Sequence, residues 1–160
     1  MNRWLQLVAL LMFAGVLMPA WGSAPLEILE LRGRINDFAE VLSEGQRRQL
    51  HQLSAQHHFN NKQFLVLVTS LGHGELDAET FSWKVWQQWS YSDKANAVML
   101  VLFKEPKEAK IMVGNALHDK LDRSTVRKII DEALVSKLQT NDFDGAAMDG
   151  YKAIIVELAR

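Results

Sequence analysis

Asn96-Ala97-Val98-Met99-Leu100-Val101-Leu102-Phe103 decides the fold, because seven apolar residues follow one another here without a polar interruption. A continuous apolar run of this length is typical of a strand that is covered on both faces of its sheet. Gln63-Phe64-Leu65-Val66-Leu67-Val68-Thr69 is a second run of the same kind. We therefore expect these two runs to form the centre of a sheet that has helices on both sides.

The flanking segments complete one α/β unit. The charged turn at 104–108 leads to a third strand at 109–113, so the last two strands form a hairpin. The helices expected around these strands are one capped by Ser43 and running to about 57, one capped by Asp77 and running to about 89, one at 125–139 and one at 143–158. This order predicts a single-domain α/β protein, a three-layer α/β/α sandwich with a mixed sheet.

A capping pattern and an aromatic pattern add detail to two of these helices. Ser43-Glu44-Gly45-Gln46 has the spacing of a capping box, in which the hydroxyl and the amide each satisfy a free N–H group of the first turn. Trp83, Trp86 and Trp89 recur at every third residue, a spacing that drifts around a helix, so not all three can be fully buried. Either one of them is exposed as an interface anchor, or all belong to the core and its edge.

Two other patterns favour structural roles over metal binding. Asn141-Asp142-Phe143-Asp144-Gly145 resembles a calcium loop only superficially, because Thr140 and Tyr151 would occupy ligand positions that need carboxylates. A helix cap followed by a turn is expected instead. His51, His57 and His58 share one predicted helix without the four-residue spacing of a metal site, so they are expected at the surface.

The first 22 residues have the three parts of a secretory signal peptide. Arg3 supplies a positive charge, residues 4–18 carry no charge, and Ala20-Trp21-Gly22 places small residues at both key positions of a cleavage site. We expect a signal peptide at 1–22, an N-terminal extension at 23–31 and a globular domain at 32–160, in the periplasm or secreted. The alternative is an uncleaved anchor, because the run from Trp4 to Trp21 has 18 residues and about 20 apolar residues span a bilayer. No second run of that length follows, so no membrane span is expected after cleavage.

Composition narrows the function classes further. The 160 residues contain 18 Lys+Arg and 19 Asp+Glu, giving a formal charge of −1, and 48% of them are hydrophobic. The apolar content is that of a globular protein, and the lack of a basic excess argues against nucleic acid as a partner. The chain has no cysteine, which excludes disulfides, cysteine-ligated zinc, iron–sulfur centres and thiol nucleophiles.

Several stretches in a fixed order resemble one known family. They are Ile35-Asn36-Asp37-Phe38-Ala39-Glu40-Val41-Leu42 before the Ser-Glu-x-Gln helix start, the run at 63–69, the helix ending at Trp89, the run at 96–102, Val113-Gly114-Asn115-Ala116-Leu117, and Asn141-Asp142-Phe143-Asp144-Gly145 with Gly150. Together they cover about residues 32–159 and resemble the TPM domain family. That family includes thylakoid-lumen and photosystem II repair proteins, bacterial exported proteins and receptor-accessory proteins, and its fold is an α/β/α sandwich.

The resemblance implies calcium binding and acid phosphatase activity in some members, and assembly or maintenance of membrane complexes in others. The family pattern is Asp-Asn-Gly before the central strand, then Gly-x-Gly-Leu-Glu and Thr-Asp after the hairpin. Here Ala95-Asn96-Ala97, Gly114-Asn115-Ala116-Leu117-His118 and Asp122-Arg123 stand at those places. Up to three acidic ligands are thereby lost, and calcium prefers six to eight oxygen ligands. If a metal ion such as calcium still binds, its ligands are expected to be Asp93, Asn96 and Asp122.

The loop after the third strand holds the other candidates. His118 with Asp119 or Asp122 could form an acid–base pair, or Asp122 simply caps the next helix. We expect a cleft at the carboxyl ends of the central strands, and its residues are Asn96, Gly114, Asn115, His118, Asp119 and Asp122. The chain is expected to be a non-enzymatic binding or accessory factor for envelope or membrane proteins. The alternative is a calcium-dependent acid phosphatase acting on small phosphate esters.

Overall fold

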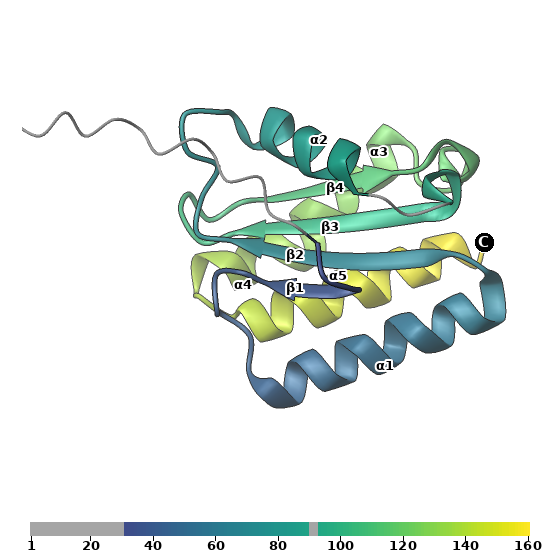
Figure 1. Cartoon of the computed structure of the whole chain (residues 1–160), viewed down its shortest axis with the longest axis horizontal. Coiled ribbons are helices and arrows are strands. Elements are labelled where there is room, and N and C mark those ends of the chain that lie inside the picture. Colours follow the sequence, from purple (N-terminus) through teal and green to yellow (C-terminus); the bar gives the residue numbers. More distant parts are fainter. Residues whose placement is uncertain (1–30, 90–92) are drawn as a thin grey trace, which may run out of the picture.

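A four-stranded mixed sheet forms the middle layer of the molecule (Figure 1). The computed structural model describes residues 31–89 and 93–160. The strands are ordered β1-β2-β3-β4, and they are β1 (Ile35–Asp37), β2 (Phe64–Ser70), β3 (Ala97–Phe103) and β4 (Ala109–Val113). The first three run parallel, whereas β4 runs antiparallel to β3. The predicted hairpin and the mixed sheet are confirmed.

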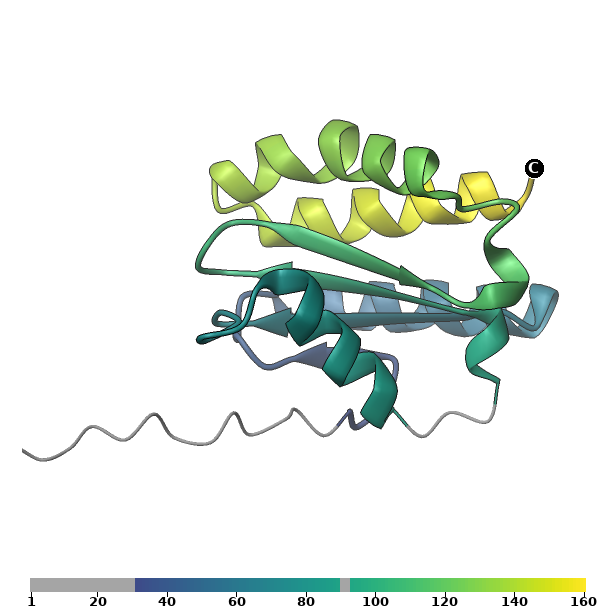
Figure 2. The same ribbon diagram turned by 90° about the horizontal axis from the view of Figure 1, so that it is seen from above.

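Helices cover both faces of this sheet, as Figures 1 and 2 show. On one face lie α1 (Glu44–Asn61), α3 (Arg123–Ile129), α4 (Val135–Gln139) and α5 (Phe143–Leu158). On the other face lies α2 (Ala78–Gln88). Two short 3-10 turns, η1 (Lys94–Asn96) and η2 (Asn115–Leu117), stand before β3 and after β4. The three-layer sandwich expected from the element order is therefore confirmed.

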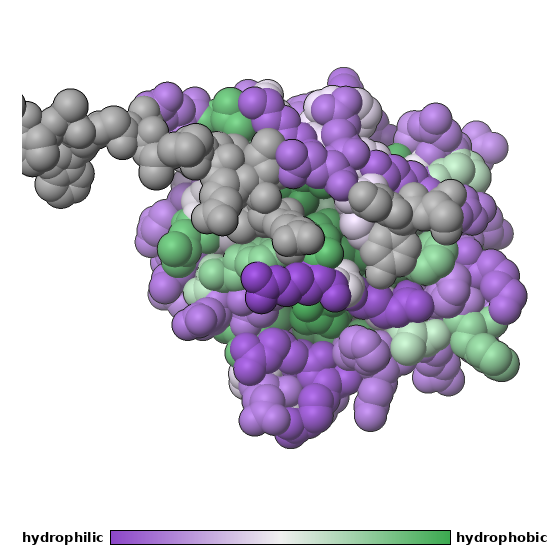
Figure 3. Space-filling model, in the orientation of Figure 1, coloured by the Kyte–Doolittle hydropathy of each residue, from purple (hydrophilic) through white to green (hydrophobic). Residues whose placement is uncertain are grey.

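Strand β3 shows why its sequence is continuously apolar. Val98, Leu100 and Leu102 pack into the core beneath α1, α3, α4 and α5, while the alternate residues pack beneath α2. Every residue of β3 is buried. On the α2 side, the partly buried side chains of Leu31, Phe38 and Phe64 pack against this core. Figure 3 shows apolar atoms in the middle of this face, surrounded by polar ones.

Strand β1 was not expected from the sequence. Only Ile35 of its three residues is apolar, so no alternating pattern marks it as a strand. The strand exists because its neighbour β2 supplies a parallel edge and because the Asn36 side-chain amide donates to the carbonyl oxygens of Gly33 and Leu67, at 2.9 and 3.3 Å. Tertiary contacts thus decide a segment that local propensity leaves open.

The helix predicted at 125–139 begins at Arg123 and is interrupted by a π turn. That turn, η3 (Ile130–Leu134), lies between α3 and α4. The fully core-facing residues are Ile129, Leu134 and Leu138, whose spacing is five residues and then four. A π turn accommodates one extra residue per turn, so it keeps all three side chains on the buried face.

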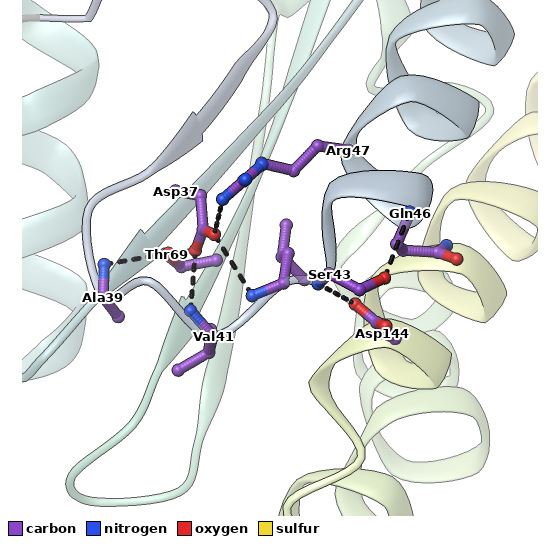
Figure 4. Close-up of polar contacts among 9 residues, drawn as sticks. Asp37, Ala39, Val41, Ser43, Gln46, Arg47, Thr69 and Asp144 are labelled. Carbon is purple, nitrogen blue, oxygen red and sulfur yellow. Dashed lines mark hydrogen bonds and ion pairs between the residues drawn. The ribbon is translucent and has the colours of Figure 1, made fainter.

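The helix N-termini are capped largely as predicted. Asp77 accepts from the Thr80 N–H at 2.8 Å, and Asp142 accepts from the Gly145 N–H at 2.8 Å, so the segment around Asp142 is a helix cap. At α1 the Ser43 hydroxyl accepts from the Gln46 N–H at 3.2 Å. The second predicted hydrogen bond of the capping box, from the Ser43 N–H to the Gln46 side chain, is wrong. The Ser43 N–H donates instead to the Asp144 carboxylate at 2.9 Å (Figure 4).

The histidine prediction is correct only in part. His51 is exposed, but His57 is buried, and its Nε2 lies 2.9 Å from Gln63 Oε1. His58 is half-buried, with its ring centroid 4.0 Å from that of Phe64. The hydrogen bond to a residue of the following strand explains why a polar ring at position 57 faces inward, and burial lowers its pKa.

The prediction that not all three tryptophans are fully buried is confirmed, because Trp86 and Trp89 are buried and Trp83 is 49% exposed.

The predicted signal peptide at 1–22, and the anchor that is its alternative, lie outside the described residues. Within residues 31–89 and 93–160, no helix has the length and apolar character needed to cross a bilayer.

Candidate functional site

The predicted cleft residues gather at one end of the β3–β4 hairpin, although not at the end that we expected. Asn96 directly precedes β3 and Gly114 directly follows β4, and the two strands run antiparallel. These residues therefore lie at the amino ends of β2 and β3 and at the carboxyl end of β4 alone. The prediction of a cleft at the carboxyl ends of the central strands is wrong, because the hairpin reverses the direction of β4.

Gly114 is required here by a close backbone approach. A Cβ atom at this position would lie 2.1 Å from the Lys94 carbonyl oxygen and 2.4 Å from that of Ala95. No side chain can share that space, since real Cβ atoms do not come within 3.0 Å of such neighbours. The Gly114 N–H also donates to the Ala97 carbonyl at 2.8 Å. Gly114 thus allows η1 to pack directly against the strand that precedes η2.

His118 interacts with the backbone rather than with its acidic neighbours. Its Nε2 lies 3.0 Å from the Val113 carbonyl oxygen. A carbonyl only accepts, so Nε2 carries the proton in this contact. Asn115, His118 and Asp119 are exposed. The acid–base pair considered from the sequence would require His118 to turn away from Val113.

Asp122 caps α3, the structural role considered from the sequence. Its carboxylate accepts from the Thr125 N–H at 2.7 Å and from the Ser124 hydroxyl at 2.9 Å. These hydrogen bonds, the Thr125 backbone N–H first among them, lower the pKa of Asp122 because they favour the charged form. The carboxylate is thereby fixed at the helix N-terminus.

The three predicted metal ligands do not converge on one point. Asn96 Nδ2 donates to Asp93 Oδ2 at 2.9 Å, so these two side chains satisfy each other. Asp122 lines the neighbouring groove, while Asp93 and Asn96 do not. Over the described ranges, no group of three or more His, Asp or Glu side chains is placed to hold a metal ion. This arrangement does not fit a calcium ion, which needs six to eight oxygens.

A groove of about 1180 Å³ adjoins these residues and extends along β4. Its walls come from α2 on one face of the sheet, α3 on the other, and the η1 and η2 turns at one end. Figure 2 shows β4 between α2 and the α3–α4 helices. The apolar side chains that line it are Trp83, Trp86, Ile111, Met112, Val113, Leu121, Val126 and Ile130. Of the predicted cleft residues, Gly114, Asn115, His118 and Asp122 line it, whereas Asn96 and Asp119 do not.

The charged lining of this groove is mainly cationic. Its four cationic side chains are those of Lys94, Lys110, Arg123 and Arg127, against the acids Glu79 and Asp122. Arg127 lies 3.7 Å from Asp131 and Lys94 donates to the Gln87 carbonyl at 2.8 Å. Within the described part of the chain, Lys110 and Arg123 form no ion pair. Sequence reasoning missed this cluster, because its members come from three separate elements, namely η1, β4 and α3.

Asp37 is the best-connected polar side chain at the opposite end of the sheet (Figure 4). Oδ1 accepts from the Val41 N–H and the Thr69 hydroxyl, and Oδ2 accepts from the Leu42 N–H and Arg47. The carboxylate is 4% exposed. With both oxygens occupied, Asp37 holds the β1–α1 loop in place rather than presenting a free ligand.

Comparison with known proteins places this fold and these residues in one family. The model of the TPM domain matches residues 35–157. A comparison with curated proteins gave no match.

Two solved structures share the fold. The solution structure of the N-terminal domain of a protein from P. gingivalis is 20% identical, with a TM-score of 0.72 over 78% of this chain and 80% of that one. The N-terminal domain of the cg2496 protein from Corynebacterium glutamicum is 13% identical, with a TM-score of 0.63 over 84% and 83%. At these identities the likeness concerns the fold alone, whereas the family model covers most of the sequence. The chain belongs to the TPM domain family.

Proposed function

We propose that this protein is an exported accessory factor that binds an envelope protein through the groove beside β4. The observation that carries the proposal is the half-exposed Trp83 at the rim of a groove with four cationic side chains. Tryptophan and arginine are the residue types that most often dominate binding energy at protein interfaces. Apolar side chains between them would lose water on binding, which supplies the driving force.

Export is part of this proposal and rests on residues 1–22. Its test is the intact mass of the protein taken from the cell envelope, because cleavage after Gly22 leaves Ser23 as the first residue. The mass of the uncleaved chain would instead support a membrane-tethered factor. Recovery of the protein only from the cytoplasm would refute export.

Site-specific photo-crosslinking tests the binding role. A photo-reactive amino acid replaces Trp83 in one variant and Phe59 in a matched control, because Phe59 is 77% exposed but lies on α1, away from the groove. We expect a discrete protein adduct from position 83 that is absent from position 59 and is lost when Arg123→Glu is added. The same adducts from both positions would refute the groove as the binding site.

A phosphatase acting on small phosphate esters is the second candidate; the calcium ion that the resemblance implies has no converging ligands among the described side chains. The observation in its favour is that Lys110 and Arg123 line the groove without ion-pair partners among the described residues, and such cations suit a phosphate ester. The test is hydrolysis of a chromogenic phosphate ester with calcium and with chelator. Hydrolysis that is lost in Arg123→Ala, whether or not it needs calcium, would support this candidate, and no hydrolysis would eliminate it.

A further inference from the structure

We infer that the groove binds an extended acidic segment of a partner protein, which adds to the sheet as a strand beside β4. The inference rests on the proposed function and specifies its mode of binding. Strand β4 is an edge strand, paired only with β3 in the described residues. An edge strand presents a row of backbone groups to which a further strand can pair.

The hydrogen-bond pattern shows which groups of β4 face outward. The Gly114 N–H donates to Ala97 and the Phe103 N–H donates to Glu108, at 2.8 and 2.9 Å. In an antiparallel pair, hydrogen-bonded and non-hydrogen-bonded positions alternate. The backbone groups that point away from β3 are therefore those of Ala109, Ile111 and Val113. Only the Val113 carbonyl has a partner there among the described residues, namely His118.

The side walls of the groove complement such a strand. The side chains of an added strand would alternate between the α2 wall and the α3 wall. The first wall carries Trp83 and Lys94 beside Lys110, and the second carries Arg123 and apolar Val126. Each wall therefore combines apolar surface with positive charge.

Charge complementarity selects the occupant. The two cations without ion pairs, Lys110 and Arg123, project from β4 and from the first turn of α3, one on each side of the edge. A segment in which two apolar residues alternate with two acidic ones presents both kinds of side chain to each wall and would pair with both cations, whereas a basic segment would be repelled. The occupant is thus an extended segment with acidic side chains rather than a helix or a basic peptide.

Peptide probes test the strand geometry on the unaltered full chain. The probe is a fluorescent eight-residue peptide in which Val-Val and Glu-Glu pairs alternate, and its binding is followed by fluorescence polarisation. Two further versions carry N-methyl groups on the amides of the odd-numbered residues or of the even-numbered residues, so each blocks one hydrogen-bonding edge. We expect one version to bind as the parent does and the other to lose binding. Equal behaviour of both versions, or equal binding of a Val–Lys peptide, would overturn the inference.

Variants test the placement of the peptide. Arg123→Glu and Lys110→Glu should each weaken binding about tenfold, which corresponds to about 1.4 kcal/mol. Lys84→Glu is the matched control, because this exposed lysine of α2 does not line the groove, and it should change binding less than about twofold. Val113→Pro removes an outward N–H without touching a β3 hydrogen bond, and it should abolish binding.

The result separates the two proposals. Crosslinking from position 83 without binding of the Val–Glu probe would mean that the groove binds a partner in another manner, so the strand inference fails while the proposed function stands. If neither crosslinking from position 83 nor binding of the probe is observed, both the proposed function and the strand inference are refuted. Equal weakening by Lys84→Glu would show charge attraction without a site, and it would overturn the inference.

Discussion

Replacing Gly114 by Ala tests how tightly η1 is packed against the end of β4. The added Cβ would lie 2.1 Å from the Lys94 carbonyl oxygen and 2.4 Å from the Ala95 carbonyl oxygen. Both neighbours are backbone atoms, so relief requires movement of the η1 turn and not a side-chain rotation. Overpacking of this kind costs about 1–3 kcal/mol, and two backbone clashes place Gly114→Ala near the upper end, at about 3 kcal/mol.

The assay is thermal unfolding, with Gly45→Ala as the matched control. At about 4 °C per kcal/mol for a domain of this size, Gly114→Ala should lower Tm by about 12 °C. Gly45 lies in the first turn of α1 and nothing lies within 4 Å of a Cβ placed there. Gly45→Ala should therefore raise stability by about 0.5–1 kcal/mol through the unfolded state. A Tm for Gly114→Ala equal to that of the wild type would refute the close approach, and with it the placement of Lys94 in the groove.

Three further predictions concern groups away from this turn. Asp37→Ala should destabilise the fold by about 3 kcal/mol in urea unfolding, because three buried or half-buried donors and the exposed Arg47 lose their acceptor. Arg47→Ala should lower the free energy of unfolding by at most about 1 kcal/mol, since Arg47 is 43% exposed. Equal losses of stability in Asp37→Ala and Arg47→Ala would contradict the conclusion that Asp37 holds the β1–α1 loop in place. Burial lowers the pKa of His57 below its ordinary value of 6.5, so the neutral ring is favoured in the folded state. The contribution of the neutral His57 ring to the free energy of unfolding is fully present above about pH 6.5. It is lost as the pH falls through the lower pKa of the folded state. Urea titrations across this range should show that loss, and His57→Gln should reduce it; an unchanged pH dependence would argue against burial of this ring. Calcium should leave Tm the same as chelator does, because the acidic side chains do not converge; a rise in Tm with calcium would show a bound ion through mass action and would reopen the phosphatase candidate.

Most of the sheet could be predicted because its signals are local. A continuous apolar run marks β2 and β3, and a charged turn between apolar runs marks the hairpin. Strand β1 could not be predicted in this way, because Asn36 and Asp37 become strand residues only through contacts with β2 more than 30 positions away. The π turn at Ile130–Leu134 was missed for a similar reason, since five-residue spacing resembles an irregular helical pattern until the core position is known.

The candidate site was only partly accessible from sequence. The turn around Gly114 and Asn115 was identified through its likeness to the family pattern, and both residues line the groove. The cationic side chains were not identified, because Lys94, Lys110 and Arg123 come from a turn, a strand and a helix that the fold brings together. Their shared location depends on the antiparallel course of β4, which the composition does not reveal. The net charge of the whole chain is close to zero, so it gives no sign of a local cationic cluster.

The two edges of the sheet differ in how they resist aggregation. Exposed strand edges can template the pairing of further chains, and short edges or edge lysines discourage it. Strand β1 offers only three residues, and β4 carries Lys110 within a cationic groove. Two copies joined through β4 would bring like charges together, which opposes fibril growth. The cationic side chains to which we assign an acidic partner segment would therefore also oppose self-assembly of the protein through this edge.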